Sequence, residues 1–65
     1  MTDSMAEMDR AYSRDMGEER LLRDVARALK GILTDARLTP KEKHDVTVAR
    51  EALLRRADQI VAVWD

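Results

Sequence analysis

The sequence predicts an all-α protein, an antiparallel hairpin of two helices with a third helical segment before it. The chain has two glycines, one proline and 3% aromatic residues, which argues against a β fold because strands need turn residues and aromatic or branched side chains. Apolar residues recur at steps of three and four along most of the chain. A strong signal for the start of a helix, Thr39 followed by Pro40, lies in the second half of the chain.

The chain is long enough for one domain, residues 1–65, but that domain is small. A fold of 65 residues buries only about 60% of the surface that its unfolded chain exposes. Small folds usually add disulfides, a metal ion or self-association to their core. Because the chain has no cysteine and one histidine, we expect association with itself or with a partner protein.

Charge and hydropathy exclude several classes of partner. The formal net charge of −1 gives no general attraction to nucleic acid or to an anionic membrane. The longest apolar run, residues 60–64, is far shorter than the roughly 18 residues of a membrane span, and the first residues lack the features of a signal peptide. We therefore expect a cytoplasmic protein. The arginine-rich cation usage is compatible with a high-GC bacterial or phage gene.

The first predicted helical segment covers residues 4–16. Ser4 and Glu7 have the spacing of a capping box, so we expect the helix to start there. Its apolar residues form one stripe: Met5, Met8, Tyr12 and Met16. Methionine is flexible and polarisable, so this stripe suits an adaptable contact surface. The alternative is that these side chains fill gaps against the hairpin.

Gly17 separates two apolar stripes that point in different directions. At about 100° per residue, the stripes before and after Gly17 point roughly 120° apart, and one straight helix cannot bury both against the same neighbour. Either Gly17 ends the first helix in the left-handed conformation, or one long helix continues through it and its two halves contact different surfaces. The second alternative costs about 1 kcal/mol relative to alanine. The sequence leaves both open.

The second helical segment covers residues 18–33. We expect its apolar side to bury Leu21, Leu22, Val25, Leu29, Ile32 and Leu33. The opposite side carries a row of four cations: Arg20, Arg23, Arg27 and Lys30. This row is the strongest candidate for contact with nucleic acid. The competing interpretation is a solvated face with surface ion pairs, and the lack of excess positive charge favours it.

A short connection, residues 34–39, leads into the return helix, residues 40–63. Thr39 is the expected N-cap, Pro40 occupies the first helical position and Glu42 completes a capping box. The apolar stripe of this helix is the most regular in the chain: Val46, Ala49, Leu53, Ala57, Ile60 and Trp64. Leu54 and Val61 widen it. Because the connection is short, we expect the two helices to be antiparallel neighbours.

The hairpin register leaves one mismatch. Continued to its end, the pairing brings Glu18 and Asp15 beside Ile60 and Trp64, which is unfavourable unless the carboxylates reach solvent or the indole N–H. We therefore expect Ile60, Val61 and Trp64 to be covered by something else. The candidates are a folded-back N-terminal segment, a second copy of the chain in a helical bundle, or a different protein.

The sequence contains no motif for catalysis, a cofactor or a metal ion. There is no glycine-rich phosphate loop, no cysteine and no serine–histidine arrangement with a third partner, and His44 falls on the predicted solvent side. We therefore predict no catalytic, cofactor-binding or metal-binding residues and a protein that is not an enzyme. The expected role is a protein–protein interaction or regulatory module, such as an adaptor, an inhibitor or an antitoxin.

The predicted partner-binding surface joins the methionine stripe to the C-terminal apolar end. Its residues are Met5, Met8, Tyr12, Met16, Ile60, Val61 and Trp64, with Tyr12 and Trp64 as anchors. A Trp64 ring packed on Met8 or Tyr12 of the same chain would count against this surface. The alternatives are an RNA- or DNA-binding hairpin that uses the cation row, and a structural subunit of a larger assembly.

Overall fold

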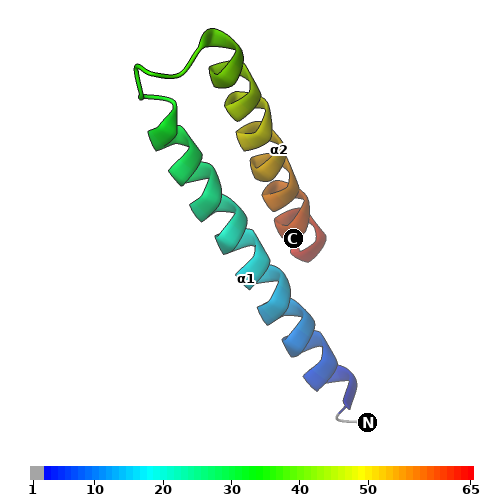
Figure 1. The fold of residues 1–65 in the computed structure, drawn as a ribbon. Coiled ribbons are helices and arrows are strands. Elements are labelled where there is room, and N and C mark those ends of the chain that lie inside the picture. The colour runs from blue at the N-terminus through cyan, green and yellow to red at the C-terminus, as the bar shows by residue number, and fades with distance from the viewer. Residues whose placement is uncertain (1–2) are drawn as a thin grey trace.

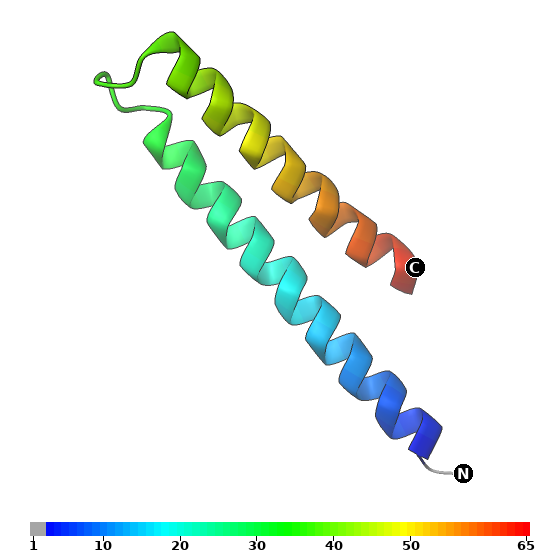
Figure 2. The same cartoon turned by 45° about the vertical axis from the view of Figure 1, so that its right-hand side comes forward.

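The protein is an antiparallel hairpin of two long helices (Figure 1). The structure is a computed structural model that describes residues 3–65 and the side chains of residues 5–65. Helix α1 spans Asp3–Ile32 and helix α2 spans Pro40–Trp64. The helices lie side by side in two views (Figures 1 and 2), and the described part of the chain forms no strand. The predicted all-α hairpin is confirmed.

Helix α1 is continuous through Gly17, so the first predicted segment is an extension of the helix and a separate N-terminal helix is not formed. Among the described residues no glycine has a positive φ, and Gly17 does not take the left-handed conformation that would end the helix. The helix begins at Asp3. The predicted capping box of Ser4 and Glu7 depends on a side chain outside the described ones.

Replacing Gly17 with alanine is expected to raise the free energy of unfolding by about 1 kcal/mol, because glycine is the poorer residue in a helix interior. A Cβ atom at Gly17 meets nothing within 4 Å, so the substitution adds no clash. Urea unfolding followed by circular dichroism measures the change. A loss of stability would contradict a continuous helix at this position.

The strip of α1 that contacts α2 lies between the two apolar stripes of the sequence. Ala26 is 1% exposed, and Leu22 and Leu29 beside it are half-buried. A straight helix can therefore meet α2 along most of α2's length, with one edge of the second stripe, Leu22 and Leu29, turned toward α2.

This orientation corrects the predicted burial of three residues of α1. Leu21, Val25 and Ile32 are 63%, 41% and 45% exposed. Because each residue advances about 100° around the helix, these three side chains lie roughly 100–140° away from Ala26. They form a second side of α1 that α2 does not cover.

The core of the hairpin is thin. Among the described residues, only Ala26, Ala57 and Ile60 are buried, and no large side chain is fully buried. Along the predicted stripe of α2, Val46, Leu53 and Trp64 are half-buried and Ala49 is exposed. Small alanines at the contact allow the helices to approach closely, but they bury little apolar surface.

The start of α2 matches the sequence prediction. The Thr39 hydroxyl accepts a hydrogen bond from the Glu42 backbone N–H at 3.1 Å, and the Glu42 carboxylate accepts one from the Thr39 N–H at 2.9 Å. The capping box is therefore confirmed. The bond from the Thr39 backbone holds the pKa of Glu42 below its ordinary value of 4.5.

The hydrogen bond to Glu42 predicts a pH dependence of stability. A carboxylate whose pKa is lowered by folding stabilises the native state above its unfolded pKa, and this stabilisation is lost as the pH falls through the lower, folded pKa. Glu42→Gln keeps an acceptor oxygen but cannot titrate. Urea unfolding between pH 7 and pH 3 should show a smaller loss in Glu42→Gln than in the wild type. The same loss in both would contradict the capping interaction, and Glu51→Gln, on the exposed side of α2, is the control.

The connection between the helices is closed by local hydrogen bonds. It covers residues 33–39, one residue more than predicted. The Asp35 carboxylate accepts hydrogen bonds from the backbone and the guanidinium of Arg37 at 2.9 and 2.8 Å, and these bonds lower the pKa of Asp35. The Thr34 hydroxyl donates to the Gly31 carbonyl at 2.7 Å near the end of α1. Leu38 is half-buried under the corner.

Helix α1 extends well beyond the end of α2 (Figures 1 and 2). Trp64, the last residue of α2, lies beside Tyr12, and residues 3–11 of α1 lie beyond this contact, toward the start of the helix. We call these residues the overhang. In the described part of the chain, neither helix has an apolar stretch of the length needed to cross a membrane.

Candidate interaction surfaces

Trp64 is held by two residues of α1. Its indole N–H donates a hydrogen bond to the Asp15 carboxylate at 3.0 Å. Its ring packs edge-on against Tyr12, with ring centroids 5.2 Å apart and planes at 88°, a favoured geometry for two aromatic rings. The carboxylate that the sequence register brings beside Trp64 is therefore satisfied by the indole.

Of the three predicted covers for Ile60, Val61 and Trp64, the N-terminal segment of the same chain is the one present, although it continues α1 in a straight line and does not fold back. Ile60 is 4% exposed, and Val61 and Trp64 are half-buried. The reason is that α1 does not end at Gly17, and its continuation reaches the C-terminal end of α2. The packing of Trp64 on Tyr12 in the same chain is also the contact that counts against the seven-residue surface.

What remains of that surface lies on the overhang and just after it. Met5, Met8 and Tyr12 are 75%, 63% and 49% exposed, and Met16 is half-buried. A shallow depression of about 470 Å³ follows them on α1. It is lined by Tyr12, Ser13, Met16, Gly17, Glu19 and Arg20. The role of Met5, Met8, Tyr12 and Met16 in binding a partner stays a prediction.

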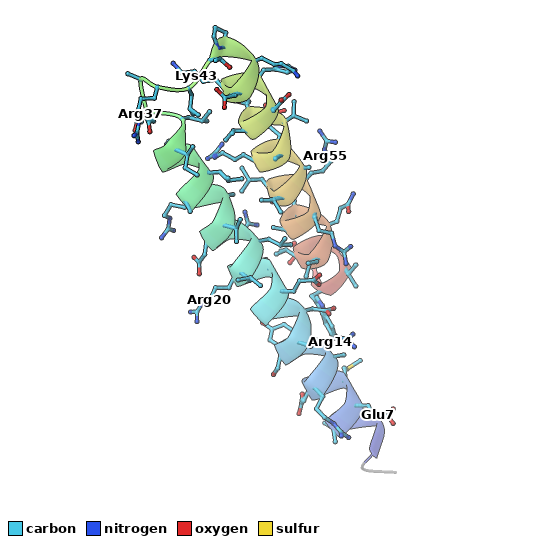
Figure 3. The ribbon with its side chains drawn as sticks, viewed as in Figure 1. Glu7, Arg14, Arg20, Arg37, Lys43 and Arg55 are labelled. Carbon is cyan, nitrogen blue, oxygen red and sulfur yellow. The ribbon has the colours of Figure 1, made fainter. Side chains whose placement is uncertain are left out.

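The cation row does not lie opposite α2 as predicted. Arg23 turns toward α2, where its guanidinium donates to Glu19 at 2.7 Å and to Asp58 of α2 at 3.1 Å. These two hydrogen bonds, the one to Glu19 above all, raise the pKa of Arg23. Arg20, by contrast, projects away from α2 (Figure 3). The row therefore runs along one flank of the hairpin, because the contact strip is rotated from the predicted one.

Arg50 joins this flank from the other helix. Its guanidinium donates to the Ala26 carbonyl of α1 at 3.2 Å. A shallow depression of about 280 Å³ lies here between the helices. It is lined by Arg23, Ala26, Arg27, Lys30, Arg50 and Leu54. The sequence reasoning missed Arg50, although it lies four residues after Val46 and three before Leu53 and so shares their side of α2.

The opposite flank of the hairpin is apolar. It carries the exposed Leu21, Val25 and Ile32 of α1. Glu18 lies three residues before Leu21, so it is on the same side of α1. Glu18 forms an ion pair with Arg56 at 3.8 Å, and Arg56 therefore marks the side of α2 that adjoins the apolar flank. Because the sequence pattern predicts that these apolar residues are buried in the core, it does not reveal them as a surface.

No group of three or more histidine, cysteine or acidic side chains in residues 5–65 is arranged to hold a metal ion, and His44 is exposed. The side chains instead form three surfaces: the overhang, the basic flank and the apolar flank. Comparison with family models, with curated proteins and with solved structures finds no match to this chain.

Proposed function

We propose that this chain is a small, non-enzymatic helical interaction module of the cytoplasm, which acts by binding a partner protein or a second copy of itself. The observation that carries the proposal is the overhang of α1. It presents Met5 and Met8, at 75% and 63% exposure, on one side of a helix that no other part of the described chain covers.

The overhang has the features of a helix that binds in a groove. Met5, Met8 and Tyr12 follow one another at steps of three and four, the spacing by which an amphipathic helix places its anchors in a partner. The edge-on contact with Trp64 positions the Tyr12 ring at the base of this stripe. A helical end without tertiary contacts has little stability of its own, so a partner that buries the methionines would also order it.

Site-specific photo-crosslinking tests the proposal. A benzophenone amino acid replaces Met8 in the full chain, which is then irradiated in an extract of the cells that encode it. We expect one predominant adduct, whose mass identifies either a second copy or another protein. The control carries the same probe at Ala6, which lies roughly 160° around the helix from Met8.

Charge variants of the overhang make this test specific. A Met5→Glu, Met8→Glu double variant should fail to compete for the adduct, because burying two carboxylates in an apolar contact is costly. An Ala6→Glu, Arg10→Gln double variant changes the charge by the same amount on the other side of the helix and should compete like the wild type. Equal adducts from positions 6 and 8, or no adduct from either, would contradict the proposal.

Nucleic-acid binding is the second candidate function. It is favoured by the meeting of cations from both helices at the basic flank, where Arg27 and Lys30 are exposed and Arg50 comes from α2. Contacts of this kind bind the phosphate backbone and not the base edges. Neutralisation of Arg23 by Glu19 and Asp58 weakens this candidate.

Binding to structured RNA at low salt tests the second candidate. An Arg27→Glu, Lys30→Glu double variant should lose affinity, and wild-type affinity should fall steeply as salt is raised. Lys41→Glu, Arg55→Glu is the matched control, since Arg55 projects from the side of α2 away from α1 (Figure 3). If both double variants bind equally, the basic flank is not a nucleic-acid interface.

A further inference from the structure

Helix α1 carries two apolar seams with coiled-coil spacing, and the hairpin uses only one. Residues 22, 26, 29 and 33 form the seam against α2, and all four are buried or half-buried. One residue earlier, a second seam has the same steps of four, three and four: Leu21, Val25, Ala28 and Ile32. All four of its residues are exposed. A helix with two such seams is suited to pack against two neighbours.

Small residues of α2 lie beside the second seam. Arg56 reaches Glu18 of α1 on the apolar flank, and Ala52 and Ala49 precede Arg56 by four and seven residues, so they share its side of α2. Both alanines are exposed. The hydrogen bond from Arg50 to the Ala26 carbonyl shows how the two helices are aligned along their axes. In this alignment Ala49 and Ala52 lie at the same level as Val25 and Ala28. The centre of the flank is therefore apolar on both helices.

The exposed area of the chain matches the need of a dimer. A compact monomer of 7.5 kDa is expected to expose about 4,250 Å², whereas this chain exposes 5376 Å². The excess, about 1,100 Å², includes the area of the overhang as well as that of the flanks, and it is comparable with the roughly 800 Å² that each partner buries in a standard interface. Because the core of the hairpin is thin, burying part of this excess in a dimer would stabilise the chain.

We propose that the apolar flank binds a second copy of this chain, and that two hairpins pack antiparallel, α1 on α1 and α2 on α2, about a twofold axis. This goes beyond the proposed function, which depends on the overhang. The axis would cross both helices at the height of the Arg50 to Ala26 hydrogen bond.

The flank is complementary to itself in this arrangement, as a twofold interface requires. Leu21 and Ile32 are equally far from the proposed axis along α1, so each meets the other across the interface. Asp45 and Arg56 are related in the same way along α2, so a carboxylate of one copy meets a guanidinium of the other. Packing α1 on α2 of the second copy would instead bring Leu21 to Arg56 and Ile32 to Asp45, which is less favourable.

Sedimentation equilibrium on two variants that each add one carboxylate tests the interface. The wild type should reach twice the mass of one 7.5 kDa chain in the micromolar range. Val25→Glu should raise the dissociation constant by roughly tenfold or more, because it buries unpaired charge at the interface. Ala62→Glu is the control: Ala62 is exposed and lies roughly 120° around α2 from Arg56, outside the flank, so this variant should leave the dissociation constant unchanged.

The proposal is overturned if the wild type stays monomeric to millimolar concentration. In that case the flank would be covered by a different protein and not by a second copy. The proposal is also overturned if Val25→Glu and Ala62→Glu dissociate equally. Circular dichroism checks that both variants keep their helices. Because neither Val25 nor Ala62 belongs to the overhang, these results are independent of the crosslinking at Met8.

Charge reversal tests the antiparallel register. Asp45→Arg should weaken the dimer, since it faces Arg56 of the other copy. The double variant Asp45→Arg, Arg56→Asp should recover part of the lost affinity, because it restores the pair between copies but removes the ion pair of Arg56 with Glu18. The helicity of each variant is compared with the wild type as before. No recovery in a folded double variant would contradict the register.

Discussion

Replacing Ile60 with alanine is expected to lower the free energy of unfolding by about 3 kcal/mol. Ile60 is 4% exposed and is the largest of the three buried side chains among the described residues. Its truncation would remove apolar burial and leave a cavity where the two helices meet. Because small folds have little stability in reserve, this one change should leave a large fraction of the chain unfolded at 37 °C.

Urea unfolding of Ile60→Ala measures this loss, and Val63→Ala is the matched control. Val63 lies on the same turn of α2 but is 77% exposed, so its truncation should change stability by less than about 0.5 kcal/mol. The sequence alone had placed Ile60 on a partner-binding surface. A folded Ile60→Ala chain of wild-type stability that loses only partner binding would support that placement and contradict the structure.

Replacing Trp64 with alanine is expected to cost about 2 kcal/mol. The variant loses the edge-on contact with Tyr12, worth about 1 kcal/mol, and the hydrogen bond from the indole to Asp15, worth roughly as much. Some apolar burial is lost as well. Since Trp64 is the last residue of α2, we also expect the final turn of that helix to fray.

Trp64→Phe separates the two contributions. Phenylalanine keeps an aromatic ring beside Tyr12 but cannot donate to Asp15, so about half of the loss should return. Urea unfolding followed by circular dichroism serves all three chains, because it does not depend on indole fluorescence. If Trp64→Ala and the wild type unfold at the same urea concentration, Trp64 is not docked on α1.

The hairpin could be predicted from the sequence because its decisive signals are local. The hydroxyl of Thr39, the fixed φ of Pro40 and the carboxylate of Glu42 act within one turn, and the structure contains each of their contacts. The pairing of Asp15 with the Trp64 indole could also be predicted, because extending the antiparallel register of the two helices places Asp15 beside Trp64.

The rotation of α1 could not be predicted in the same way. Apolar spacing identifies a stripe but does not say which of two neighbouring seams α2 selects, and α2 selects the one through Ala26. Leu21, Val25 and Ile32 were therefore assigned to the core. Gly17 gave a signal compatible with either a break or a continuous helix, and the choice depends on contacts, such as Tyr12 with Trp64, that form only in the folded chain.

The most direct test is the dependence of thermal unfolding on protein concentration, because we expect association to complete this thin-cored hairpin. If a second copy completes it, the Tm followed by circular dichroism should rise by several degrees over a hundredfold increase in concentration, because mass action favours the associated state. A monomer that unfolds cooperatively at one unchanging temperature above about 60 °C would be a self-sufficient domain and would contradict the claim.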